Sequence, residues 1–391
     1  MKNICVVTGS RAEYGLLKPL INKIKLDKNL NLQLIVTGMH LSSEFGLTYK
    51  EIEKDNFFIK DKIEVNLSSD TPSAICKSIS LGIIGFSDSF NRLNPHIIIV
   101  LGDRYEILAS CIAATIHNIP IAHINGGEST EGVMDEAIRH SITKMSYLHF
   151  TSTETYRNRV IQLGEDHSRV FNVGALGVEN ILNLRLLSKE ELEKYIGFKF
   201  DSKVALLTYH SVTLDKENHY YEFNEILNAL DEFENLKIIF TKGNSDTNGR
   251  IINDLIDKYV STHKEKSISF KSMGQLNYLS AMKYSSFVIG NSSSGLIEAP
   301  TFNIPTINIG DRQRGRICPK SVINTNCKKQ EVINAINTAT SQDFLLTIKN
   351  NENIYGNGQT SYKILETIKH FLYENKINLK KSFYNIDVCK D

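Results

Sequence analysis

Short apolar runs alternate with amphipathic stretches along most of this chain. In the first half the runs are residues 4–8, 32–37, 96–102, 119–124 and 170–174, and in the second half they are 203–210, 236–243, 285–293 and 303–310. Runs that are apolar on both faces and separated by helical stretches are typical of parallel β-α-β units. Because this rhythm occurs twice, we predict an α/β protein with two Rossmann-like domains.

Two further segments bear on the domain boundaries. Residues 180–203 are polar with helical spacing, and we predict that they link the domains as a hinge. Residues 361–375 form a predicted helix that packs on either half, because apolar residues recur there at helical spacing: Ile364, Leu365, Ile368, Phe371 and Leu372. We therefore place the N-terminal domain at 1–180 and the C-terminal domain at 181–360.

Size and charge exclude several classes of protein. The 391 residues exceed one ordinary core and suit two domains of about 150 to 200 residues. Lys and Arg total 45 against 44 Asp and Glu, so no overall field attracts nucleic acid or an anionic membrane. No apolar run approaches the ~20 residues of a membrane span, and the N-terminus resembles a first strand rather than a signal peptide. We expect a cytoplasmic protein in which local groups bind any anion.

The cysteines give no sign of a metal site or a disulfide framework. They are scattered, without a CxxC pair or a neighbouring histidine cluster: Cys5, Cys76, Cys111, Cys318, Cys327 and Cys389. We expect no bound metal and reduced, mostly buried thiols.

Candidate site residues follow the apolar runs, because ligands of parallel sheets bind beyond the carboxyl ends of the strands. In "TGSRAEYG" (8–15), Arg11 and free backbone amides at a helix start suit a phosphate, although a plain turn with a solvated arginine would look the same. After residues 96–102, Asp103 either takes part in proton transfer or caps a helix running to about His117. Neither a GxGxxG nor a P-loop pattern is present.

The segment "HINGGESTEGVMDEAIRHSITK" (123–144) carries the most candidate chemistry. Two glycines allow close approach of a ligand, and these charged or titratable residues follow: Glu128, Asp135, Glu136, Arg139 and His140. Asp135 and Arg139 share a helix face, so an ion pair would hold the carboxylate in place. Several acids around a glycine loop suit acid–base chemistry on a carbon-bound proton, whereas a capped helix with surface charges would explain some of them only.

The second half has its own polar strand ends. His210 ends the run 203–210, where it is either structural or functional. In "IGNSSSGLIEAP" (289–300), hydroxyls and amides from Ser292 onward suit a diphosphate at a helix start, and Glu298 can accept two hydrogen bonds from a ribose diol. A serine cap would explain one serine. The next strand is followed by three arginines: Arg312, Arg314 and Arg316. We interpret these features as a nucleoside diphosphate site.

With these segments placed, the chain resembles the hydrolysing UDP-N-acetylglucosamine 2-epimerases of bacterial sialic-acid biosynthesis. The likeness covers nearly the whole chain and rests on "TGSRAEYG", "VTGMHLSSEFG", "LGDRYE", "GGESTEGVMDEAIRHSITKMS", "GNSSSGLIEAP" and "GDRQRGR". It implies a GT-B-like fold, in which two Rossmann-like domains with parallel sheets face a central cleft that holds UDP. The last helix then returns to the first domain. The resemblance also implies a cytoplasmic homo-oligomer, dimer or tetramer, that acts on a UDP-sugar for capsule or surface polysaccharide.

The family chemistry that this resemblance implies is elimination followed by hydration. A base removes the proton at sugar carbon 2, UDP leaves to give a 2-acetamidoglucal, and water adds to release N-acetylmannosamine, without a metal or another cofactor. The resemblance places three residues at catalytic positions: Asp103, Asp135 and His210. It places five at the UDP: Arg11, Ser292, Ser293, Glu298 and Arg312.

Two departures from the family pattern leave alternatives open. Asn125 stands where some relatives have an acid, and because an amide cannot act as a base, Glu128 or Asp135 is expected to do that work. The "HSVT" turn (210–213) lacks a proline common in relatives, which makes the turn less rigid. The alternative functions are a UDP-N,N'-diacetylbacillosamine 2-epimerase of legionaminic-acid biosynthesis, a non-hydrolysing epimerase, a GT-B glycosyltransferase and a UDP-sugar sensor without turnover.

Overall fold

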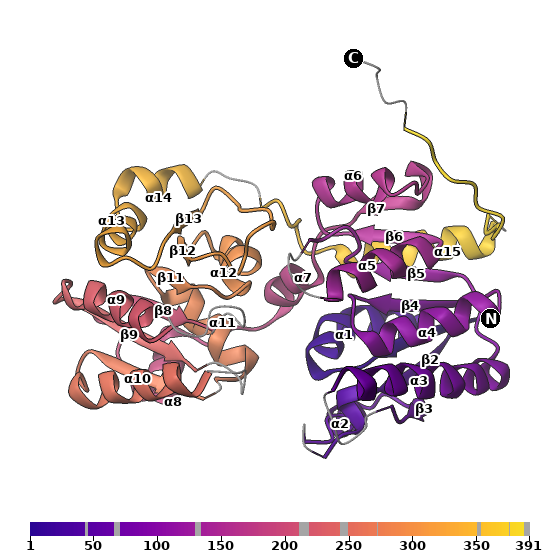
Figure 1. The fold of residues 1–391 in the computed structure, drawn as a ribbon, viewed down its shortest axis with the longest axis horizontal. Coiled ribbons are helices and arrows are strands. Elements are labelled where there is room, and N and C mark those ends of the chain that lie inside the picture. The colour runs from indigo at the N-terminus through magenta and orange to yellow at the C-terminus, as the bar shows by residue number, and fades with distance from the viewer. Residues whose placement is uncertain are drawn as a thin grey trace. The chain divides into compact units, whose positions relative to one another are not determined.

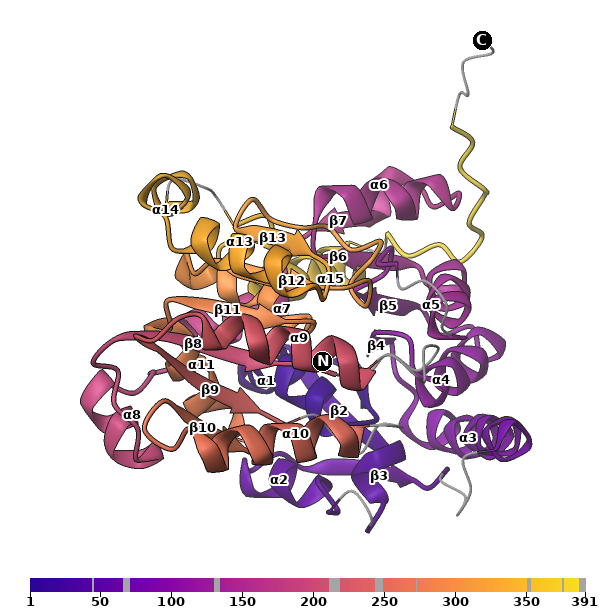
Figure 2. The same cartoon turned by 60° about the vertical axis from the view of Figure 1, so that its left-hand side comes forward.

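The computed structural model divides the chain into two compact units (Figures 1 and 2). It describes residues 1–43, 46–65, 71–129, 134–210, 219–242, 249–271, 273–349, 353–374 and 376–386. Unit 1 comprises residues 1–180 together with 355–391, and unit 2 comprises residues 181–354. Each unit is built on one parallel sheet, which confirms the predicted α/β class.

Unit 1 has a seven-stranded sheet in the order β3-β2-β1-β4-β5-β6-β7. Its strands are β1 (Lys2–Thr8), β2 (Leu30–Thr37), β3 (Ile59–Ile63), β4 (Ile97–Leu101), β5 (Ile121–Ile124), β6 (Leu148–Thr151) and β7 (Val170–Asn172). Its helices are α1 (Arg11–Leu26), α2 (Tyr49–Lys54), α3 (Pro72–Leu93), α4 (Tyr105–Ile116), α5 (Met134–Met145), α6 (Glu154–Gln162), α7 (Leu176–Asn183) and α15 (Thr360–Tyr373), with 3₁₀ turns at Gly38–Leu41 and His167–Arg169.

Successive residues of β1 pack on opposite faces of this sheet, as a strand buried on both sides requires. Ile4 and Val6 join a core that α1 and α15 cover, whereas Cys5 and Val7 join a core beneath α3, α4 and α5. The returning helix α15 contributes five buried side chains to the first of these cores: Ile364, Leu365, Ile368, Phe371 and Leu372.

Unit 2 has a six-stranded sheet in the order β10-β9-β8-β11-β12-β13. Its strands are β8 (Lys203–Thr208), β9 (Leu236–Thr241), β10 (Ser267–Phe270), β11 (Phe287–Gly290), β12 (Thr306–Ile309) and β13 (Val322–Thr325). Its helices are α8 (Lys189–Ile196), α9 (His219–Asp231), α10 (Gly249–Thr262), α11 (Gly274–Tyr284), α12 (Ser294–Ile297), α13 (Lys329–Ala339) and α14 (Gln342–Lys349), with a 3₁₀ turn at Ala299–Phe302.

The segment predicted as the linker includes a helix that packs in unit 2. Residues 180–203 were predicted to connect the domains, but α8 lies within this stretch and buries Leu192 and Ile196 in a core of unit 2, beside Val204 and Leu206 of β8. The apolar residues of α8 recur at helical spacing because one face of this otherwise polar helix packs on the core of unit 2.

The chain passes between the units at two places, and both ends of unit 2 attach to neighbouring segments of unit 1. The backbone amide of Ala175 donates to the carbonyl of Tyr355 at 2.8 Å. Glu179, which is buried, accepts from the backbone amide and the hydroxyl of Ser361, each at 2.5 Å. Gly174 has a φ of +88°, and a Cβ there would lie 2.8 Å from the Tyr355 carbonyl oxygen. Unit 2 is therefore inserted between two segments of unit 1, residues 1–180 and 355–391, which contact each other where they leave and re-enter this unit.

Two expectations from composition can be compared with the described residues. None of the helices in the part of the chain that the structure describes is long and apolar enough to cross a membrane. The five described cysteines are free thiols, but Cys76 and Cys318 are exposed, so the prediction that the thiols are mostly buried is wrong for these two. Both are outside the strands whose packing buries Cys5.

Candidate active site

Asp103 lies just beyond the carboxyl end of β4, where it pairs with the guanidinium of Arg139 on α5. Arg139 is 4% exposed, and it also donates to Glu136 Oε2 at 2.7 Å and to the Glu128 carbonyl at 2.9 Å. The N-cap of α4 is Arg104, not Asp103. Asp103 is therefore held by an ion pair with a buried arginine, and the helix-cap alternative does not apply.

Asp135 occupies the first turn of α5 and is partly exposed. Burial raises its pKa, and the negative charge of Asp103 raises it further. Glu128 Oε1 accepts from the hydroxyl of Ser152 at 3.4 Å. The ion pairs of Arg139 run to Asp103 and Glu136 and not to Asp135, which differs from the expected pairing along the helix. Of the predicted acids of unit 1, Asp103 thus pairs with the buried Arg139, Glu128 contacts this arginine through its backbone carbonyl, and Asp135 interacts with Asp103 and Arg139 through its charge.

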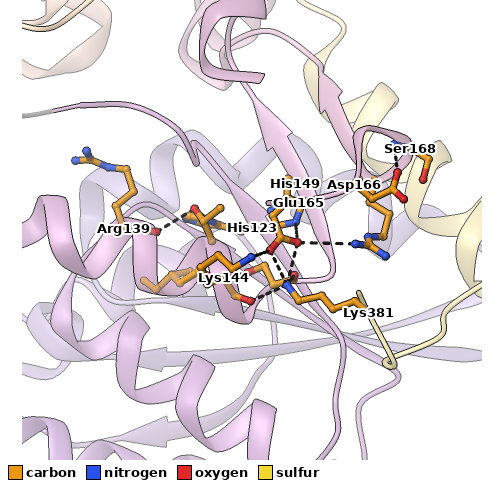
Figure 3. Close-up of polar contacts among 12 residues, drawn as sticks. His123, Arg139, Lys144, His149, Glu165, Asp166, Ser168 and Lys381 are labelled. Atoms are coloured by element: carbon orange, nitrogen blue, oxygen red, sulfur yellow. Dashed lines mark hydrogen bonds and ion pairs between the residues drawn. The ribbon is translucent and has the colours of Figure 1, made fainter. Parts of the chain in front are cut away.

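A buried histidine of β5, His123, connects this strand to the end of β4 and to α5. His123 Nε2 lies 2.8 Å from the carbonyl of Gly102, and its Nδ1 lies 3.3 Å from Oγ1 of Thr143 on α5 (Figure 3). Burial lowers the pKa of His123 to about 3, so the ring is neutral near neutral pH and links Gly102 to Thr143 by hydrogen bonds. Asn125, two residues later, has a φ of +66°. Asn and Asp are the non-glycine residues that best tolerate this left-handed conformation, so the backbone here accepts Asn without distinguishing it from Asp.

Arg11 begins α1, and its side chain is 63% exposed, 3.4 Å from Glu51 Oε2. The structure therefore shows it at the predicted helix start, with an acid as its partner. The amide of Gly9 is instead occupied by Glu13 Oε2 at 2.7 Å.

Sequence reasoning missed a pair of buried acids below this turn, Glu13 and Glu106. Glu106 is fully buried, and Arg104 Nε lies 2.5 Å from its Oε1. Burial, followed by the charge of Glu106, raises the pKa of Glu13 to about 8. The Ser10-x-x-Glu13 spacing of a capping box was a usable signal for Glu13, whereas nothing in the sequence marks Glu106 as its neighbour.

In unit 2 the ends of β8 and β11 are joined by Asn291. Its side chain accepts from the His210 amide at 2.7 Å and donates to the His210 carbonyl at 2.8 Å. Arg312 and Gln313 both donate to the Asn291 carbonyl, at 3.0 and 2.8 Å. The structure therefore brings His210 and Arg312 together at one strand end, while residues 211–213 of the predicted turn lie outside the described residues.

The serines follow directly, at the start of the one-turn helix α12. Ser293 is the N-cap residue but makes no side-chain capping bond. Ser294 Oγ lies 2.6 Å from the Tyr278 hydroxyl and 3.2 Å from Ser292 Oγ. A simple serine cap therefore does not account for this loop, and its hydroxyls form a compact polar group.

Glu298 ends α12, on the far side of the serines from β11. Burial raises its pKa to about 7, so near neutral pH it exists in both protonation states. A polar cavity of about 440 Å³ lies beyond β12, and its walls include Asn308, Gln313, Arg314, Arg316, Asn324 and Glu331. Within the described ranges, no group of three His, Cys, Asp or Glu residues is placed to hold a metal ion.

Comparison with known proteins gives a consistent result. The family described as UDP-N-acetylglucosamine 2-epimerase matches residues 22–369. The chain is 47% identical over 324 residues to "GDP/UDP-N,N'-diacetylbacillosamine 2-epimerase (hydrolyzing)" of Campylobacter jejuni, covering 83% of this chain and 84% of that protein. It is 40% identical over 390 residues to "Polysialic acid biosynthesis protein P7" of Escherichia coli, covering 100% and 99%.

A solved structure shows the same fold. The UDP-GlcNAc 2-epimerase from Neisseria meningitidis bound to UDP-GlcNAc superposes with a TM-score of 0.79 at 20% identity, covering 94% of this chain and 100% of that one. The two parallel-sheet units are therefore of the GT-B-like kind.

Proposed function

The chain belongs to the UDP-N-acetylglucosamine 2-epimerase family, and we propose that it hydrolyses a UDP-sugar to UDP and the free sugar epimerised at carbon 2. The observation that carries this proposal is the ion pair between Asp103 and the buried Arg139, together with the raised pKa of Asp135, to which the charge of Asp103 contributes. Glu128 contacts the same arginine through its backbone carbonyl. Acids at the carboxyl edge of a parallel sheet, one with a raised pKa, suit removal and return of a carbon-bound proton.

The reaction that these acids serve has two steps. In the first, a carboxylate takes the proton from sugar carbon 2, the carbon–oxygen bond to UDP breaks, and a carbon 1–carbon 2 double bond forms in a 2-acetamidoglucal. In the second, water adds its hydroxyl to carbon 1 and a proton returns to carbon 2 on the opposite face. We assign proton transfer to Asp103, Asp135 and His210, with Glu128 taking the role of the acid that Asn125 replaces.

The nucleotide is assigned to unit 2. Ser292, Ser293 and Arg312 are proposed to bind the diphosphate, because hydroxyls, amides and a guanidinium converge beyond β11 and β12. Glu298 is proposed to accept hydrogen bonds from the ribose. Arg11 is the proposed phosphate ligand of unit 1, which requires it to exchange Glu51 for phosphate.

Two substrates are specific candidates. UDP-N-acetylglucosamine, giving N-acetylmannosamine for sialic acid, is the first, and the identity to the E. coli polysialic acid protein supports it. UDP-N,N'-diacetylbacillosamine is the second, and the higher identity to the Campylobacter protein favours it. The two sugars differ at carbons 4 and 6, so the acids around carbon 2 serve either one.

The deciding experiment is NMR of the purified protein with each UDP-sugar in heavy water. We expect free sugar of the manno configuration, UDP in equal amount, and deuterium at carbon 2. Retention of protium at carbon 2 would exclude the elimination route, whereas a UDP-linked product would indicate the non-hydrolysing reaction. The substrate is the sugar with the larger kcat/KM.

We further propose that the enzyme works in the cytoplasm as a homo-oligomer, a dimer or tetramer, supplying sugar for a surface polysaccharide. The near-neutral net charge of +1 supports a location without a nucleic-acid or membrane partner. Light scattering on the purified chain decides the oligomeric state, and a monomeric mass would reject this part.

A further inference from the structure

The segment that follows α15, residues 376–386, returns over unit 1 and inserts a lysine into it. Lys381 Nζ donates to the carbonyls of Lys144 and Ser146, at 2.6 and 2.8 Å (Figure 3). It also lies 3.0 and 2.9 Å from the two carboxylate oxygens of Glu165. One ammonium group thus contacts four oxygens, which is an unusually complete set of partners for a lysine near a chain end.

Glu165 makes this a buried contact rather than a surface tether. Its side chain is 1% exposed, and Lys144 and His149 also bind it, at 2.6 and 3.1 Å. Burial by itself raises the pKa of Glu165, but hydrogen bonds from His149, Lys144 and Lys381 hold it at about 2. The carboxylate is therefore charged, and a buried charge of this kind requires its partners.

Several contacts next to Lys381 fix the same segment. The Tyr384 amide donates to the Gly164 carbonyl at 2.9 Å. The Phe383 ring fills the space beside Gly164, where a Cβ would lie 2.4 Å from it, and Lys144 Nζ lies 4.9 Å from the ring centroid. The Tyr147 hydroxyl donates to the carbonyl of Lys376 at 2.8 Å. The segment lies beyond residues 22–369 that the family matches.

The two carbonyls that Lys381 binds lie at the carboxyl end of α5. The last carbonyls of a helix have no partner within the helix, and a cation there is favourable. The opposite end of α5 carries Asp135 and, one turn on, Arg139, which holds Asp103. Between the two ends, Thr143 Oγ1 lies 3.0 Å from the Arg139 carbonyl and 3.3 Å from His123.

From these contacts we infer that Lys381 is a positioning residue: it anchors the carboxyl end of α5 and so fixes the acids at the other end of that helix. The inference that this affects turnover rests on the proposed function, because only that function assigns chemistry to Asp103 and Asp135. The anchoring itself depends on contacts alone and is testable without any substrate.

The test compares three variants of the full chain. Lys381→Met keeps the length of the side chain and removes its charge, Lys381→Arg keeps a donor, and Lys380→Met alters the exposed neighbouring lysine as a control. Hydrogen exchange of the α5 amides and steady-state kinetics are measured for each. We expect faster exchange in residues 134–145 and a kcat about 10- to 100-fold lower only in K381M, with KM nearly unchanged, because a small misplacement of reacting groups costs that much.

Each outcome decides one part of the inference. Unchanged α5 exchange in K381M overturns the anchor, and faster exchange with unchanged kcat overturns the positioning role. K381R is expected to recover most of the kcat, and equal loss in K380M would indicate a general effect of the segment. If wild type turns over neither UDP-sugar, the proposed function fails while exchange still decides the anchor. Should K381M not fold, Lys381→Gln, which removes the charge but keeps a polar side chain, replaces it with the same criteria.

Discussion

At the scale of single residues, burial and ion pairing give chemically similar acids different environments. Asp103 is fixed by Arg139, whereas the pKa of Asp135 is raised first by burial and then by Asp103. A fixed carboxylate next to one that protonates more readily is a pattern found where one group accepts a proton and another returns it. The difference arises from the environment, because both residues are aspartates.

Replacement of either aspartate by asparagine is expected to reduce kcat by roughly two to four powers of ten, the scale of a lost general acid or base, with UDP affinity little changed. Asp88→Asn, on the exposed face of α3, is the control. Kinetics and calorimetry with UDP measure the two quantities. Glu128→Gln tests whether Glu128 replaces the acid absent at Asn125, and full activity in both aspartate variants would reject the assignment.

A second residue-scale prediction concerns Glu13, whose pKa burial and Glu106 raise to about 8. The folded state retains a proton that the unfolded state releases above its ordinary pKa of about 4.3. The contribution of Glu13 to stability is therefore lost progressively as the pH rises from about 4.5 towards 8. We expect the Glu13→Gln variant to lose less stability than wild type between pH 5 and pH 8.5, measured by urea unfolding.

Asp88→Asn again serves as the control for Glu13→Gln and should follow wild type at each pH. A difference between Glu13→Gln and wild type that does not change with pH would mean that Glu13 is already charged in the folded protein. That result would contradict the raised pKa and point to a second cation near the pair of acids.

Sequence reasoning located residues at strand ends but not their partners. Asp103 and His210 directly follow apolar runs, so their positions at the carboxyl ends of strands could be predicted, whereas Asp135 was located only by its place at the start of a predicted helix. Which of the two aspartates pairs with Arg139 could not be predicted, because the pairing depends on the distance between β4 and α5. Glu106 was missed for the same reason: besides the nearby Arg104, its neighbours Gly9 and Gly38 come from other parts of the chain.

At the scale of elements, every apolar run that predicted a strand contains one, whereas four short strands were not predicted: β3, β6, β10 and β13. β3, β10 and β13 are edge strands, whose residues are only partly buried. β6 is buried but includes His149, a polar residue that interrupts the apolar signal. The buried His149 ring has Glu165 as its hydrogen-bonding partner, and no local sequence pattern reveals this pairing.

The join between β8 and β11 gives a prediction for Gly290. Its φ is +130°, and a Cβ there would lie 1.9 Å from the Thr208 carbonyl oxygen. Gly290→Ala is therefore expected to destabilise the protein by about 2 kcal/mol or more, because neither the backbone nor the neighbouring strand accommodates it. Gly15→Ala, in the interior of α1 with open space around it, should instead stabilise by about 0.5 to 1 kcal/mol.

Urea unfolding of the two glycine variants gives their free energies directly. Tolerance of alanine at position 290 would show that β11 can move away from β8. The catalytic interpretation would then lose a rigid support for His210 and Asn291, which join the same two strands.

At the scale of the whole molecule, repetition of the apolar rhythm was sufficient to predict two parallel-sheet domains. The rhythm could not show that α8 packs in unit 2, because a linker helix and a packed helix have similar spacing. Helix 361–375 illustrates the same limit, since its apolar face fitted either half; the family resemblance implied a return to the first domain, and the structure shows the helix in the core beside α1. For both helices, tertiary contacts and not the local apolar pattern determine the unit on which the helix packs.

The insertion of unit 2 between adjoining segments of unit 1 determines the order in which the newborn chain can fold. A ribosome completes residues 1–180 before it makes α15, whose five apolar side chains close the core over α1. At about 5 to 20 residues per second, the intervening residues, 181–359, take roughly 10 to 40 s to synthesise. Unit 2 is synthesised in full before α15 is available to cover the core of unit 1. The unit whose synthesis begins first is therefore the last to complete its core, and the apolar surface that α15 covers stays exposed to solvent until then.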